Sequence, residues 1–115
     1  MKILVVHEHR HVLEACRLCL EPAGYLVETA YDADEALAAM DMLEFDLLVI
    51  DEHIRRMSAH KLLEWHHTHR REVPVLVLVE KMTDLTLRPF ITESVCKPFS
   101  VPAFVALVGG ILASL

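Results

Sequence analysis

The sequence predicts an α/β fold in which helices cover both faces of a parallel β-sheet. Two patterns indicate this fold. Short and nearly continuous apolar runs recur along the chain, as in strands that are buried on both faces. Between them, apolar residues recur three or four positions apart, as on one face of a helix. Strands and helices alternate five times, which favours a doubly wound sheet with right-handed crossovers.

Five segments are expected to form the strands. The first reads "KILVV" and the second "YLVETA". The third and fourth, "DLLVID" and "VPVLVLV", are continuous apolar runs, and a short fifth segment reads "SVC". The predicted strands span 2–6, 25–30, 46–51, 73–79 and 94–96.

The first three predicted helices are placed by their apolar faces and their capping residues. Apolar residues recur with helical spacing over 12–20. Asp32, with Glu35 three residues later, forms a capping-box pattern at the start of the second helix. Ser58 starts the third helix, with Leu62, Leu63 and His66 on one side, and the "HHTH" at 66–69 is expected to be its exposed end.

The last predicted helix is capped by Ser100 and ends at about Ala113, with Pro102 tolerated in its first turn. The segment before it is less regular. Pro89 prevents a helix from running through 80–93, because proline lacks the amide hydrogen that a helix interior needs.

Composition limits the class of protein. The 115 residues suffice for a single domain, 1–115, and the 54% hydrophobic content excludes intrinsic disorder. The formal net charge of -6 argues against a nucleic-acid surface in this domain. The uncharged stretch at 99–115 is shorter than the roughly 20 residues that cross a membrane.

Cysteine usage points to the cytoplasm. Three cysteines without a secretory signal predict reduced thiols. Cys16 and Cys19 form a C-x-x-C, but they fall inside a helical pattern, whereas a redox pair usually lies where a helix begins. We therefore expect buried thiols.

Chemistry-bearing residues follow the ends of four predicted strands. In an open parallel sheet, ligands bind at the carboxyl ends of the strands. These ends carry an imidazole, carboxylates and an ammonium group, and these groups are expected to converge. The proline after Lys97 favours a fixed turn, and a cis peptide bond is one way to form it. The residues are His7, Glu8, Asp51, Val79, Glu80 and Lys97.

In this order and spacing, the segments resemble the receiver domain of bacterial two-component response regulators. "KILVV" with an acidic position after it, "AGYLVETA" with "DADEAL", "FDLLVID", "VPVLVLV" and "CKPFS" carry the resemblance, which covers essentially the whole chain. It implies a flavodoxin-like sheet with strand order 2-1-3-4-5. It also implies phosphotransfer from a partner histidine kinase to an aspartate, assisted by Mg²⁺.

The resemblance assigns roles to four residues. Asp51 matches the aspartate that accepts the phosphoryl group, and Lys97 matches the lysine that contacts the phosphoryl oxygens. Glu8 matches the second residue of the acidic pair that holds Mg²⁺ together with the aspartate. His7 matches the first residue of that pair, which is normally aspartate.

The same positions depart from the family pattern. Mg²⁺ prefers oxygen ligands, so the imidazole of His7 predicts weak Mg²⁺ binding and weak or absent phosphorylation. Val79 replaces the hydroxyl residue of the family's switch, and Ser94 replaces its aromatic residue. The segment from Val79 to Lys97 is shorter than usual by ~4 residues, one helical turn, which predicts a short or irregular fourth helix.

Two other features suggest binding. Imidazole suits transition metals, so His7, Glu8, Asp51 and His53 form a candidate metal site. The last helix carries no charged residue, which predicts a homodimer or interdomain contact on its outer face. Phe104, Leu107, Val108 and Ile111 are expected to face the sheet, and Val101, Val105 and Leu112 to face outward.

Three functions are compatible with these observations. The first is a conventional receiver phosphorylated at Asp51. The second, which we favour, is an atypical receiver that acts through protein–protein contacts, and the third is a metal-binding sensor using His7. An enzyme is not expected, because no nucleophile with a partnered base and no glycine-rich phosphate loop is present. The kinase, the signalling partner and any output domain are not specified by the sequence.

Overall fold

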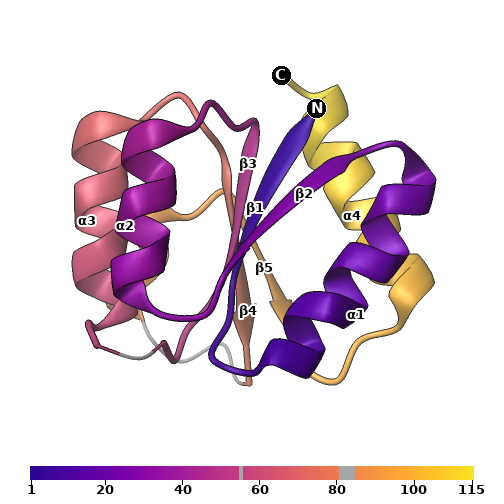
Figure 1. The fold of residues 1–115 in the computed structure, drawn as a ribbon, viewed down its shortest axis with the longest axis horizontal. Coiled ribbons are helices and arrows are strands. Elements are labelled where there is room, and N and C mark those ends of the chain that lie inside the picture. The colour runs from indigo at the N-terminus through magenta and orange to yellow at the C-terminus, as the bar shows by residue number, and fades with distance from the viewer. Residues whose placement is uncertain (55, 81–84) are drawn as a thin grey trace.

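The computed structural model describes residues 1–54, 56–80 and 85–115. Its five strands form one parallel sheet in the order β2-β1-β3-β4-β5, which confirms the predicted topology (Figure 1). The cores of all five strands lie where the sequence predicts them. The strands are β1 (Lys2–Val6), β2 (Leu26–Ala30), β3 (Leu47–Asp51), β4 (Val75–Val79) and β5 (Glu93–Cys96).

Helices cover both faces of this sheet. Figure 1 shows α2 and α3 on one side and α1 and α4 on the other. Helix α1 begins two residues before the predicted Val12, and α4 is the last helix of the chain. The elements are α1 (Arg10–Leu20), η1 (Glu21–Ala23), α2 (Ala33–Met42), α3 (Ala59–His69), η2 (Leu85–Phe90) and α4 (Val101–Ala113).

The sheet separates two apolar layers. Every residue of β3 and β4 is buried, so these two strands form the centre of the molecule. The layer under α2 and α3 includes Met40, Leu62 and Val77, and the layer under α1 and α4 includes Leu20 and Phe104. Among the described residues, no helix is long and apolar enough to cross a membrane.

Side-chain caps fix where three helices begin, as predicted. Asp32 accepts a hydrogen bond from the Glu35 amide at 2.8 Å, and Glu35 accepts one from the Tyr31 amide at 2.9 Å. Ser58 and Ser100 each accept an amide hydrogen bond three residues later, at 3.2 Å. These bonds satisfy amide groups that a helix cannot pair by itself.

The connection between β4 and β5 contains a 3₁₀ helix, η2 (Leu85–Phe90), with Pro89 inside it. This confirms the predicted irregular fourth helix, although 81–84 lie outside the described residues. Leu87 anchors η2 in the core under α2 and α3. Strand β5 at the edge of the sheet has no fully buried residue, in contrast to β3 and β4.

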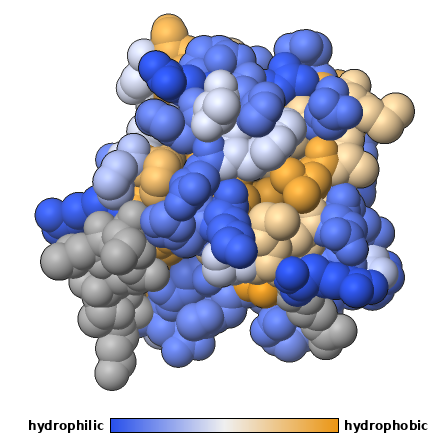
Figure 2. Space-filling model, turned by 90° about the vertical axis from the view of Figure 1, so that its left-hand side faces the viewer, coloured by the Kyte–Doolittle hydropathy of each residue, from blue (hydrophilic) through white to orange (hydrophobic). Residues whose placement is uncertain are grey.

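The two outer surfaces differ in polarity. Figure 2, which views the molecule from the side of α2 and α3, shows mostly hydrophilic residues around a smaller hydrophobic area. Helix α4 on the other side has no charged residue. Leu112 was expected on its outer face and is in fact buried, while Val101 is exposed as predicted. The outer face of α4 therefore consists largely of small residues: Pro102, Ala103, Ala106, Gly110 and Ala113.

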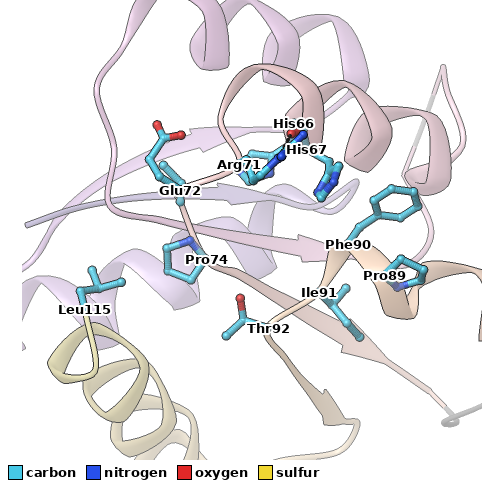
Figure 3. A pocket seen from close by; sticks show the side chains of 11 residues that line it. His66, His67, Arg71, Glu72, Pro74, Pro89, Phe90, Ile91, Thr92 and Leu115 are labelled. Carbon is cyan, nitrogen blue, oxygen red and sulfur yellow. Dashed lines mark hydrogen bonds between the residues drawn. The ribbon is translucent and has the colours of Figure 1, made fainter.

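The histidines at the end of α3 are not all exposed. His66 is 2% exposed, which corrects the prediction of an exposed helix end, and its Nε2 has no hydrogen-bond partner among the described residues. It lines a cavity of about 270 Å³ between the end of α3 and the segment that leads into β5 (Figure 3). Next to it, the rings of His67 and Phe90 meet edge-on, with centroids 5.6 Å apart.

We predict that His66 makes the protein sensitive to mild acid. Burial lowers the pKa of His66 to about 4, against an ordinary value of 6.5; Glu72 opposes this shift, and His67 and Arg70 add to it. The unfolded chain therefore binds a proton at a higher pH than the folded chain does. The free energy of unfolding should fall as the pH drops from 6.5 to 4, by up to about 3 kcal/mol from this residue.

Urea unfolding across this pH range tests the prediction with His66→Leu. The loss of stability in acid should be smaller in His66→Leu than in the wild type. His11→Leu, which removes an exposed imidazole, should behave like the wild type. Equal pH dependence in His66→Leu and wild type would contradict the prediction.

Candidate functional site

Three predicted site residues meet at the carboxyl edge of the sheet. His7 directly follows β1, Asp51 ends β3, and Lys97 directly follows β5. Backbone hydrogen bonds hold these positions: the His7 amide donates to the Ala30 carbonyl at 3.1 Å, and the Lys97 amide donates to the Val79 carbonyl at 2.8 Å. The Lys97–Pro98 peptide bond is cis, one of the forms expected for this turn.

The Asp51 carboxylate is enclosed by three partners. Its side chain is buried, and Lys97 Nζ forms a direct ion pair with Oδ1. His7 Nε2 lies 3.5 Å from the same oxygen. The other oxygen, Oδ2, accepts a hydrogen bond from the His53 amide at 2.9 Å. Both carboxylate oxygens therefore already face protein donors.

His7 is buried beside this carboxylate. Its Nδ1 accepts a hydrogen bond from the His9 amide at 3.0 Å. Burial lowers the pKa of His7 below its ordinary value, attraction to Asp51 opposes the shift, and repulsion from Lys97 and His9 adds to it. The site thus favours a neutral imidazole next to an ion pair.

The other two members of the predicted transition-metal site contact neighbouring side chains. A carboxylate oxygen of Glu8 lies 3.4 Å from His9 Nε2. The exposed imidazole of His53 lies 3.5 Å from Glu52, so His53 approaches Asp51 through its backbone amide alone. The part of the chain that the structure describes contains no group of three His, Cys, Asp or Glu side chains that could hold a metal ion. The geometry therefore gives no support to a metal sensor.

The two predicted switch positions lie on neighbouring strands. Val79 ends β4 and is buried, and Ser94 is a half-buried residue of β5. Val79 pairs in register with Cys96, two residues beyond Ser94, so Val79 and Ser94 lie on the same face of the sheet. Valine places an apolar side chain next to the site, where a hydroxyl group could have donated a hydrogen bond.

Glu52, which was not predicted from the sequence, and Arg56 also shape the site. Glu52 Oε1 accepts a hydrogen bond from the Glu80 amide at 3.0 Å and so ties the segment after β3 to the end of β4. Arg56 has a φ of 78°, a left-handed conformation that favours glycine, and its guanidinium lies 3.5 Å from Asp34. The family pattern expects glycine at this position. The neighbouring Arg55 lies outside the described residues.

The C-x-x-C cysteines lie inside α1, away from any strand end. Cys16 is buried and Cys19 is half-buried, and both are free thiols. Burial raises the pKa of Cys16 to about 11, which disfavours the reactive thiolate. This agrees with the expected buried thiols.

One known protein family matches a stretch of the chain that includes nearly all of the sheet. The model of the response regulator receiver domain matches residues 3–108. The alkaline phosphatase synthesis transcriptional regulatory protein PhoP of Bacillus subtilis is 30% identical over 115 residues, 96% of this chain and 48% of PhoP. The response regulator MprA of Mycobacterium avium is 35% identical over 81 residues, 70% of this chain and 36% of MprA. The chain thus spans less than half the length of these relatives.

Solved structures show the same fold. The chemotaxis response regulator CheY4 of Vibrio cholerae superposes with a TM-score of 0.90 at 23% identity, over 96% of this chain and 97% of CheY4. The response regulator TrrA of Thermotoga maritima, solved in complex with Mg²⁺ and BeF, superposes with a TM-score of 0.87 at 22% identity, over 96% of this chain and 97% of TrrA.

We predict that Asp51→Asn lowers the stability of the protein. An Asn side chain would turn an NH₂ group or a weaker acceptor toward Lys97 and His7, and buried donors would lose their partner. The expected loss is roughly 1–3 kcal/mol in the free energy of unfolding. Asp41→Asn, at an exposed position in α2, serves as the control and should change stability little. An Asp51→Asn variant as stable as the wild type would show that these contacts do not hold the site together.

Proposed function

Because the chain belongs to the receiver-domain family of two-component response regulators, we propose that it is an atypical member in which Asp51 is phosphorylated weakly or not at all. In this proposal the chain forms a single receiver domain, 1–115, that acts in the cytoplasm through protein–protein contacts. Receiver domains are signalling modules, and no reaction of its own is proposed for this one.

The enclosure of Asp51 carries the proposal. A phosphoryl acceptor must expose an oxygen in line with the incoming phosphorus atom. Here Oδ1 lies against Lys97 and His7, and Oδ2 is bound to the His53 amide. Phosphorylation would bring a phosphoryl group among these partners and require them to rearrange. The free-energy cost of this rearrangement would slow the transfer.

Two other properties of the site support the same function. Mg²⁺ requires several oxygen ligands in a near-octahedral shell. Around Asp51 the carboxylate of Glu8 is the one other acidic group expected from the family, and Lys97 and His7 Nε2 already face Oδ1. The described donor set therefore fits Mg²⁺ poorly, and we expect weak binding. In addition, Val79 lacks the hydroxyl group of the family's switch, and Ser94 lacks its aromatic ring.

The alternative is a conventional receiver that accepts a phosphoryl group at Asp51. The contact between Lys97 and Asp51 favours it, because the same lysine could hold a transferred phosphoryl group. In both cases the partner would be a sensor histidine kinase or another signalling protein. PhoP of Bacillus subtilis is a transcriptional regulatory protein, so a longer protein with an output domain is compatible with either function.

We predict that the protein is labelled poorly by a small-molecule phosphodonor. After incubation with the donor and Mg²⁺, intact-mass spectrometry should find little or no phosphate adduct, because Asp51 is enclosed. Asp51→Asn sets the background, and an ordinary receiver domain confirms that the conditions allow labelling. A stoichiometric adduct on the wild type that is absent from Asp51→Asn would support the conventional function instead.

Helix α4 provides the surface for the proposed protein contacts. Its exposed positions carry small or apolar uncharged residues, with Ala103, Ala106, Gly110 and Ala113 spaced by three or four residues along one face. Such a face lets another helix approach closely, and without charges it can meet a second copy of itself without repulsion. We therefore propose a homodimer through α4, with an interdomain contact in a longer protein as the alternative.

We predict that a charge on this face abolishes self-association. Sedimentation should show a dimer for the wild type and a monomer for Ala106→Glu, because a carboxylate would be buried without a partner. Leu18→Glu places the same charge on the exposed face of α1 and should remain dimeric. A monomeric wild type, or a dimer that tolerates Ala106→Glu, would contradict the homodimer.

A further inference from the structure

The backbone of the loop after β1 selects one tautomer of His7. Its Nδ1 accepts a hydrogen bond from the His9 amide, and an acceptor nitrogen carries no proton. A neutral imidazole has one N–H group, so the proton must be on Nε2. The His7 amide itself is bonded to the Ala30 carbonyl, so the ring is held at a fixed place at the end of β1.

That N–H group lies next to the buried carboxylate. Nε2 is 3.5 Å from Asp51 Oδ1, a long contact for a hydrogen bond, and Lys97 Nζ pairs with the same oxygen. Oδ1 is buried and has no hydrogen-bond partner among the described residues, so Lys97 and His7 act on it through charge and the N–H dipole. Lys97 thus presents a positive charge, and His7 an N–H dipole, to the one carboxylate oxygen that no backbone amide of the described residues reaches.

We propose that His7 is a positioning residue that replaces the divalent cation at this site. Its Nε2–H group is fixed in place by the His9 amide. Together with Lys97, it positions Asp51 and closes the site to Mg²⁺. This role goes beyond the proposed function, because it concerns what stabilises Asp51 in the resting protein. It holds whether or not Asp51 accepts a phosphoryl group.

The charges around the ring agree with this role. An aspartate at position 7 would add a second carboxylate beside Asp51, and like charges at that distance repel unless a cation lies between them. A neutral N–H donor removes this repulsion. The groups that face the ring are Asp51 and Glu8, which favour its protonation, and Lys97 and His9, which oppose it.

The tautomer can be observed directly. In ¹⁵N-labelled protein, long-range ¹H–¹⁵N spectra distinguish a protonated Nε2 from a protonated Nδ1 and from an imidazolium ion, and His7→Gln identifies the His7 signals. At neutral pH we expect Nε2 to be protonated and Nδ1 to be bare. A protonated Nδ1 or an imidazolium ion would overturn the proposal.

The proposal that His7 replaces a cation is tested with His7→Asp, which puts a carboxylate back at this position. His7→Asp should be less stable than the wild type without Mg²⁺ and should regain stability when Mg²⁺ is added. Calorimetric titration with Mg²⁺ should show binding at least about tenfold tighter in His7→Asp than in the wild type, the scale on which a single partner changes the affinity of a metal site.

His11→Asp is the matched control, because it makes the same change of charge at an exposed position in α1. It should respond to Mg²⁺ as the wild type does. Equal Mg²⁺ affinity in His7→Asp and wild type would overturn the role of His7. Neither measurement involves a phosphodonor, so a failure here is distinct from a failure of the proposed function.

Discussion

A carboxylate at the end of a strand that is buried on both faces is the constraint on which the rest of the structure depends. Every residue of β3 is buried, and its last residue is Asp51. Such a group is tolerated when positive charge and hydrogen-bond donors surround it. The parallel sheet supplies them, because the ends of neighbouring strands bring Lys97 and His7 to the same edge. The order of the strands is thus also the basis of the site.

The departures from the family pattern belong together. The imidazole at position 7 takes the place beside Asp51 that we propose it fills instead of a metal ion, and a valine at position 79 leaves no hydroxyl to follow a phosphoryl group. The η2 segment replaces a regular helix next to the strand that carries Ser94. These changes affect both the site and the surface nearby, while the uncharged face of α4 is the surface that we propose for protein contacts. The combination fits a domain whose partners recognise a single resting state.

The sequence predicts the sheet well, because apolar runs and capping residues depend on local chemistry. It also predicts that Asp51 and Lys97 meet, since the carboxyl ends of parallel strands share an edge. The wrong predictions, Leu112 outside and His66 exposed, concern residues at the border of a helical apolar face, where packing decides burial. The role of Glu52 could not be predicted, because its hydrogen bond depends on the path of two loops.

The position of Trp65 determines what optical spectroscopy can detect in this protein. It is the only tryptophan in the chain, and its ring stacks on His69 with centroids 4.2 Å apart and planes inclined by 15°. Both residues lie near the end of α3, at the edge of the sheet opposite Asp51. Tryptophan emission will therefore report the fraying of α3 and the loss of this ring stack. Events at Asp51 will need an isotope or calorimetric signal to be seen.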